Sequence, residues 1–84
     1  MLSYLFICRS VTYAQRTAKA LESAGISAVV ARAPHGLASG GCAYCVRVPG
    51  VRIAQALIAI KNAGLPPARV YTQSGSGHFR EVGA

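Results

Sequence analysis

Acidic residues and long apolar segments are scarce in this chain. Only Glu22 and Glu81 are acidic, against nine lysines and arginines, so the net charge is +7. No apolar run approaches the roughly 20 residues that a membrane-spanning helix needs. The apolar start of the chain ends at Arg9, without the basic n-region or the cleavage site of a signal peptide. We therefore expect a cytoplasmic protein with no membrane partner.

The low content of charge also excludes a disordered chain. Of the 84 residues, 52% are hydrophobic and 13% are charged, which is the composition of a folded domain. A chain of this length buries roughly 60% of its unfolded surface, which leaves little room for a deep cavity and further catalytic machinery. We therefore predict a binding or carrier module and not an enzyme. The domain should span residues 1–73, followed by a flexible Gly/Ser-rich tail over residues 74–84.

The surplus of positive charge bears on the kind of partner. It favours anionic partners such as nucleic acid, phosphorylated ligands or an acidic protein surface. The basic residues are spread singly along the chain, as on an ordinary solvated surface. The charge alone therefore does not choose among these partners, and weak, non-specific nucleic-acid binding is one expectation.

Hydrophobic periodicity predicts a strand–helix–strand unit that occurs twice. The predicted strands span residues 3–9, 26–33, 42–48 and 69–73, and the predicted helices span residues 12–24 and 51–63. Thr12 has the spacing of a capping box, with Ser10 as the alternative cap, and Gly25 and Gly64 supply left-handed stops. The order βαββαβ predicts an α+β, ferredoxin-like sandwich with two helices on one face of a four-stranded antiparallel sheet.

This topology brings the cysteines together, although they are far apart in the sequence. The first and third strands should be central and antiparallel, so Cys8 at the end of the first should approach the segment from Cys42 to Cys45 at the start of the third. The number of cysteines is three, and an odd number at uneven spacing favours reduced thiols over a disulfide framework.

The Cys-x-x-Cys spacing of Cys42 and Cys45 is weak evidence for a disulfide or a metal. In a strand the two residues lie about 10 Å apart and point to opposite faces, whereas a disulfide needs Cα atoms within about 7 Å. A closed zinc site would require the three cysteines together with His35 or His78. We therefore predict no metal and no cofactor, with a thiol metal-binding protein as an open alternative.

Cys42 is the candidate reactive thiol. Gly40 and Gly41 precede it and leave backbone N–H groups uncovered, so that a thiolate there can meet donors. Arg9, His35 and Arg47 should lie within reach and favour the thiolate. On the alternative reading, Cys42 and Cys45 are small apolar residues that pack where a hairpin ends.

The chain resembles the selenium/sulfur carrier protein-like family of small bacterial proteins over residues 4–71. The resemblance is carried by a first strand that runs into Ser10, a helix with Ala14, the Glu-Ser-Ala-Gly-Ile segment at residues 22–26, a loop with Pro34 and Leu37, and a Ser/Gly-rich approach to Cys42 followed five residues later by Arg47. Ala43, where a glycine is expected, and the additional thiol of Cys45 depart from the family's pattern.

This resemblance implies that Cys42 is a carrier thiol, which holds sulfur as a persulfide or selenium as a selenosulfide. Its partners would be donor and acceptor proteins that deliver and receive the atom. Cys45, the additional thiol, is a candidate resolving thiol for a persulfide on Cys42 or a residue that packs, and the sheet order makes Cys8 a candidate neighbour of the site.

Two further expectations come from the sheet itself. The open face could carry an aromatic and basic platform of the kind that stacks single-stranded RNA bases, formed by Tyr4, Phe6, Arg47, Arg69 and Tyr71. The predicted edge strands at residues 26–33 and 69–73 could pair between two copies and form a homodimer.

Overall fold

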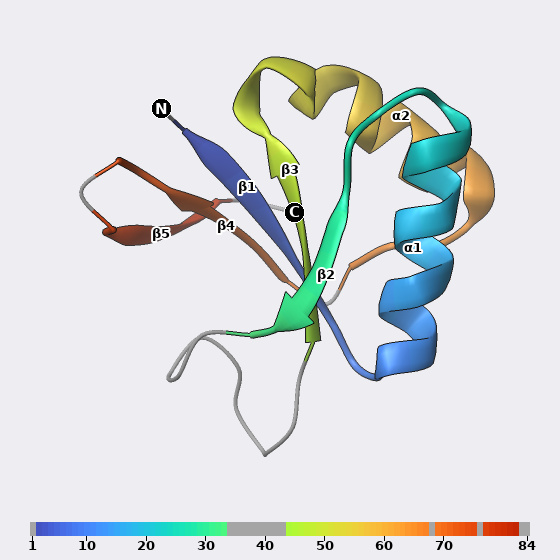
Figure 1. The fold of residues 1–84 in the computed structure, drawn as a ribbon, viewed down its shortest axis with the longest axis horizontal. Coiled ribbons are helices and arrows are strands. Elements are labelled where there is room, and N and C mark those ends of the chain that lie inside the picture. The colour runs from blue at the N-terminus through green and yellow to red at the C-terminus, as the bar shows by residue number, and fades with distance from the viewer. Residues whose placement is uncertain (1, 34–43, 68, 76, 83–84) are drawn as a thin grey trace.

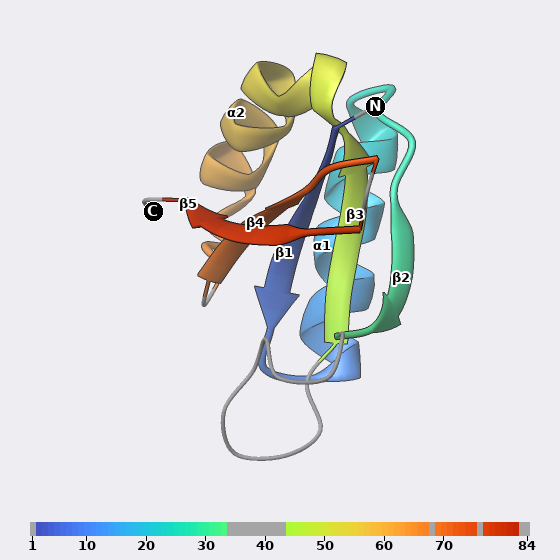
Figure 2. The same ribbon diagram turned by 90° about the vertical axis from the view of Figure 1, so that its left-hand side faces the viewer.

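The computed structural model describes residues 2–33, 44–67, 69–75 and 77–82. The elements follow one another along the chain as β1 (Ser3–Cys8), α1 (Val11–Ser23), β2 (Val29–Arg32), β3 (Tyr44–Pro49), the 3₁₀ turn η1 (Gly50–Arg52), α2 (Ile53–Ala63), β4 (Arg69–Gln73) and β5 (Phe79–Val82). Both helices lie on the same face of the sheet, and its strands twist strongly from β2 to β5 (Figures 1 and 2).

The sheet has the order β2-β3-β1-β4-β5, and all of its neighbouring strands are antiparallel. The predicted α+β class and the central, antiparallel position of the first and third strands are therefore confirmed. The positions of β1 to β4 are those of the expected ferredoxin-like arrangement.

The sheet has five strands, so the prediction of four is wrong. Phe79–Val82 pairs with β4 in the register Val70↔Val82 to Gln73↔Phe79, inside the segment predicted to be a flexible tail. The sequence of β5 is four residues long and half charged, too short for its alternation to indicate a strand without the partner. Because β4 is an inner strand, the edge predicted at residues 69–73 is not an edge of the sheet. Strand pairing between two copies could therefore use only the edge strands β2 and β5.

The helix ends follow local capping chemistry. Ser10 caps α1, since its hydroxyl oxygen accepts a hydrogen bond from the Tyr13 N–H at 3.1 Å; the cap predicted at Thr12 is wrong and the alternative at Ser10 is confirmed. Gly25 and Gly64 have φ values of 80° and 69°, the left-handed conformation that was predicted for both.

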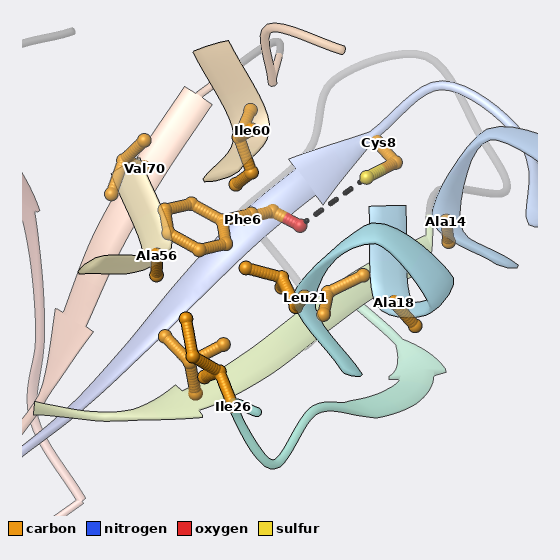
Figure 3. Packing of buried hydrophobic residues seen from close by; sticks show 11 residues of the cluster. Phe6, Cys8, Ala14, Ala18, Leu21, Ile26, Ala56, Ile60 and Val70 are labelled. Carbon is orange, nitrogen blue, oxygen red and sulfur yellow. Dashed lines mark hydrogen bonds between the residues drawn. The ribbon is translucent and has the colours of Figure 1, made fainter. Parts of the chain in front are cut away.

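The period of two along β1 divides its side chains between two clusters. Phe6 and Cys8 face the helices and join the main core (Figure 3). Leu5 and Ile7 point to the opposite face, where they pack with Cys45 and Tyr71. The buried residues of the main core are Phe6, Cys8, Ala14, Ala18, Leu21, Ile26, Val46, Val48, Ala56, Ile60 and Val70.

Candidate functional site

The end of β1 and the start of β3 lie side by side, as predicted. Cys8, the last residue of β1, is paired with Tyr44, the first residue of β3. The described part of the third strand begins at Tyr44, and its predicted start at residue 42 lies outside the described residues. Four predicted site residues lie outside the described residues: His35, Gly40, Gly41 and Cys42. Tyr44 follows Cys42 by two residues, so this end of the sheet is the place to examine for the chemistry of the segment.

Cys8 is buried in the core on the helix side. Its side chain is 1% exposed, and its Sγ lies 3.6 Å from the carbonyl oxygen of Phe6 (Figure 3). Burial raises the pKa of the Cys8 thiol, and the side chain of Thr17 offsets this only in part. Since the thiolate is the nucleophile, a neutral and enclosed Cys8 is a packing residue.

Cys45 is buried on the opposite face of the same sheet. It is 2% exposed and packs with Leu5 and Ile7, while its Sγ lies 3.8 Å from the Arg32 carbonyl oxygen. Burial raises the pKa of the Cys45 thiol, and the positive charge of Arg47 opposes this shift. This thiol also resembles a packing residue more than an exposed nucleophile.

The two described thiols are close along the backbone but separated by the sheet. Cys8 is opposite Tyr44 in the ladder, so Tyr44 shares its face and Cys45, one residue on, points the other way. The prediction that the cysteines converge is therefore confirmed for the backbone of this pair, and the side chains do not form a dithiol.

The predicted basic residues lie on different surfaces. Arg9 follows β1 directly and is exposed; with Tyr13, Pro66 and Pro67 it lines a hollow of about 240 Å³ beside the start of α1. Arg47 is exposed on β3, on the same face as Cys45. Arg32, the last residue of β2, is also exposed and is paired with Tyr44. Arg9 and Arg32 are thus two described cations at the end of the sheet where β3 begins.

One feature of this hollow was missed in the sequence. The hydroxyl of Tyr13 donates a hydrogen bond to the Pro66 carbonyl oxygen and so ties the first turn of α1 to the connector before β4. The sequence indicates that Pro66 and Pro67 form a stiff connector, but it gives no sign that the connector reaches α1.

The predicted RNA-binding platform does not form on one face. Tyr4 and Phe6 pack on the helix side of the sheet, and Tyr71, on the other side, is only 8% exposed. Of the five residues, Arg47 and Arg69 remain exposed. Strand alternation is the reason. Tyr4 and Phe6 point to one face of β1, and Leu5 and Ile7 point to the other. Tyr71 and Arg69 are paired with Leu5 and Ile7, so they lie on the face opposite Tyr4 and Phe6.

The described residues contain no group of three or more His, Cys, Asp or Glu side chains that could hold a metal ion. Within the same ranges, none of the helices is long and apolar enough to cross a membrane.

Comparison with known proteins identifies a family. No curated protein and no solved structure shows significant similarity to the chain. The model of the family described as "Putative Se/S carrier protein-like" matches residues 3–72, which include both helices and the strands β1 to β4. The resemblance found in the sequence is thereby confirmed, and the chain belongs to the Se/S carrier protein-like family.

Proposed function

We propose that this protein is a non-enzymatic thiol carrier, in which Cys42 holds a sulfur or selenium atom and passes it between a donor and an acceptor protein. Membership of the Se/S carrier protein-like family supports the class of function. The observation that carries the choice of residue is the burial of both other cysteines, which are 1% and 2% exposed and have raised pKa values. Transfer needs an accessible thiolate, and neither Cys8 nor Cys45 offers one.

The transfer is a thiol exchange that needs no net oxidant. The Cys42 thiolate attacks the outer sulfur of a donor persulfide, R–S–SH; a new S–S bond forms on Cys42, the donor's S–S bond breaks, and R–S⁻ leaves with the electron pair. An acceptor thiolate then repeats the attack on the loaded Cys42. A donor selenosulfide, R–S–SeH, delivers selenium by the same exchange, with an S–Se bond in place of the S–S bond.

Positive charge at this end of the sheet favours such a thiolate. Arg9 follows Cys8, which is paired with Tyr44, and Tyr44 is two residues beyond Cys42. A cation in this neighbourhood lowers the pKa of a thiol by stabilising its charged form. Arg47 also contributes a positive charge on β3, where it already opposes the rise in the pKa of Cys45.

Cys45 is better suited to packing than to resolving a persulfide. Its contacts with Leu5, Ile7 and Tyr71 enclose the sulfur, and attack on a neighbouring persulfide would require it to leave this cluster as a thiolate. In this proposal, Cys45 and Cys8 stabilise the two faces of the sheet while Cys42 performs the transfer.

The test is the intact mass of the protein after incubation with a low-molecular-weight persulfide or selenosulfide. The wild type and the Cys8→Ser and Cys45→Ser variants should gain one sulfur or one selenium atom, whereas Cys42→Ser should gain none. Loading that persists in Cys42→Ser, or that disappears only in Cys45→Ser, would overturn the proposal.

A further inference from the structure

The β4–β5 hairpin carries polar side chains on the face that the helices share. In its register Thr72 is opposite Arg80, and beyond the last paired residues the Ser74 N–H donates to the His78 carbonyl oxygen at 3.1 Å. Because side chains alternate along a strand, these positions fall on the same face as Val70 and Val82, which pack with the main core. The face thus changes from apolar to polar toward the tip of the hairpin.

The helices do not cover this polar part. Figure 1 shows that the tip of the hairpin points away from both α1 and α2. The uncovered surface is a hollow of about 390 Å³, lined among the described residues by Leu2, Thr72, Ser74, His78, Arg80 and Val82. We call it the hairpin hollow.

Among the described residues, no side-chain carboxylate balances the positive charge in the hairpin hollow. The chain has two acidic residues; Glu22 belongs to α1, and Glu81 is on the opposite face of β5, where its Oε1 lies 3.6 Å from Nη1 of Arg69. Among the described residues, Arg69 and Glu81 form an ion pair and Arg80 has no carboxylate partner. The guanidinium of Arg80 therefore brings a positive charge to the hollow that no described carboxylate neutralises.

The other polar groups suit the same kind of ligand. The Thr72 hydroxyl donates to the Arg80 carbonyl oxygen at 3.4 Å, which is long for an O–H···O bond, so this hydroxyl is weakly held and can turn to a better acceptor. His78 adds ring nitrogens at the rim. Leu2 and Val82 form an apolar side of the hollow, against which a short hydrocarbon part can pack.

We propose that the hairpin hollow binds a small molecule with an oxyanion headgroup, phosphate or carboxylate, and a short apolar part. Arg80 binds the headgroup through charge-assisted hydrogen bonds, Thr72 adds a hydroxyl donor, and Leu2 and Val82 contact the apolar part. This site is independent of Cys42, because none of its residues belongs to the end of the sheet where β3 begins.

The experiment is a titration of ¹⁵N-labelled protein, followed by amide chemical shifts, at constant ionic strength. The probes are inorganic phosphate, butyrate and butyl phosphate, with sodium chloride as the compensating salt. We expect saturable shifts concentrated in β4 and β5, and tighter binding of butyl phosphate than of inorganic phosphate. The stronger of the butyrate and butyl phosphate responses identifies the headgroup.

Matched variants separate a built site from general attraction to a basic protein. Arg80→Gln should weaken binding roughly tenfold or more, whereas Arg16→Gln, which removes the same charge from the exposed side of α1, should leave it nearly unchanged. Thr72→Val keeps the shape and the strand preference of the residue, and it should weaken binding even if Arg80→Gln disturbs the hairpin.

Three results would overturn the proposal: shifts that do not saturate with any of the probes, shifts spread over the whole surface, or equal losses in Arg80→Gln and Arg16→Gln. Butyl phosphate that binds no more tightly than inorganic phosphate would refute the role of Leu2 and Val82. None of these results bears on loading of Cys42.

Discussion

Replacement of Cys8 by serine should destabilise the fold, because the new hydroxyl would be buried without a good partner. The Phe6 carbonyl oxygen already lies 3.6 Å from Sγ, and a serine oxygen, on a shorter bond, stays farther from it. The Thr17 hydroxyl already donates to the Tyr13 carbonyl oxygen at 2.9 Å, so it cannot also donate to the serine oxygen, which is left without a donor. An unsatisfied buried hydroxyl costs about 1–3 kcal/mol.

This loss is large enough to measure in a domain of this size. A change of 1 kcal/mol moves the melting temperature of such a domain by about 4–8 °C, so Cys8→Ser should melt at least about 4 °C below the wild type in a circular dichroism scan. Cys8→Ala is the matched control, since it removes the sulfur without adding a hydroxyl, and it should lose less. A serine variant as stable as the alanine variant would refute the argument from the orphaned hydroxyl.

Three further predictions concern the other thiols and the first helix. At neutral pH, iodoacetamide should alkylate Cys42 well before Cys8 and Cys45, which should react only as the protein unfolds; early reaction of either would contradict their enclosure. Burial raises the folded-state pKa of Cys8 and Cys45. Their contribution to the free energy of unfolding is therefore complete below about pH 8.5 and is lost as the pH rises through the folded-state pKa values. Urea titrations should show this loss of stability in the wild type and a smaller loss in the variant with both cysteines replaced by alanine. Ser10→Ala should cost about 1 kcal/mol because it removes the cap of α1, whereas Thr12→Ala should cost clearly less, and the reverse order would place the cap at Thr12.

Much of the fold could be predicted because local patterns and topology agree. Gly25 and Gly64 stop their helices where the apolar periodicity ends, and the alternation from Cys45 to Val48 assigns Val46 and Val48 to the core. The order of strands and helices then leaves one arrangement in which β1 and β3 are central.

The parts that were missed depend on partners distant in the sequence. The strand at Phe79–Val82 acquires its order from β4, and its own four residues do not indicate it. The faces of Tyr4 and Phe6 depend on the register of β1 against β4, which the apolar run of β1 does not define, because this strand is buried on both faces. For the same reason, the sequence predicts that Cys8 and Cys45 are neighbours along the backbone, but it does not predict that their side chains lie on opposite faces of the sheet.

The most direct measurement of the carrier proposal locates the added atom in the wild-type protein. After loading with a persulfide and alkylation, cleavage by trypsin releases residues 33–47, which contain Cys42 and Cys45, and residues 1–9, which contain Cys8. Fragmentation of the first peptide between the two cysteines assigns the extra sulfur. We predict that it resides on Cys42 alone; an extra sulfur on Cys45 or on Cys8 would contradict the proposal.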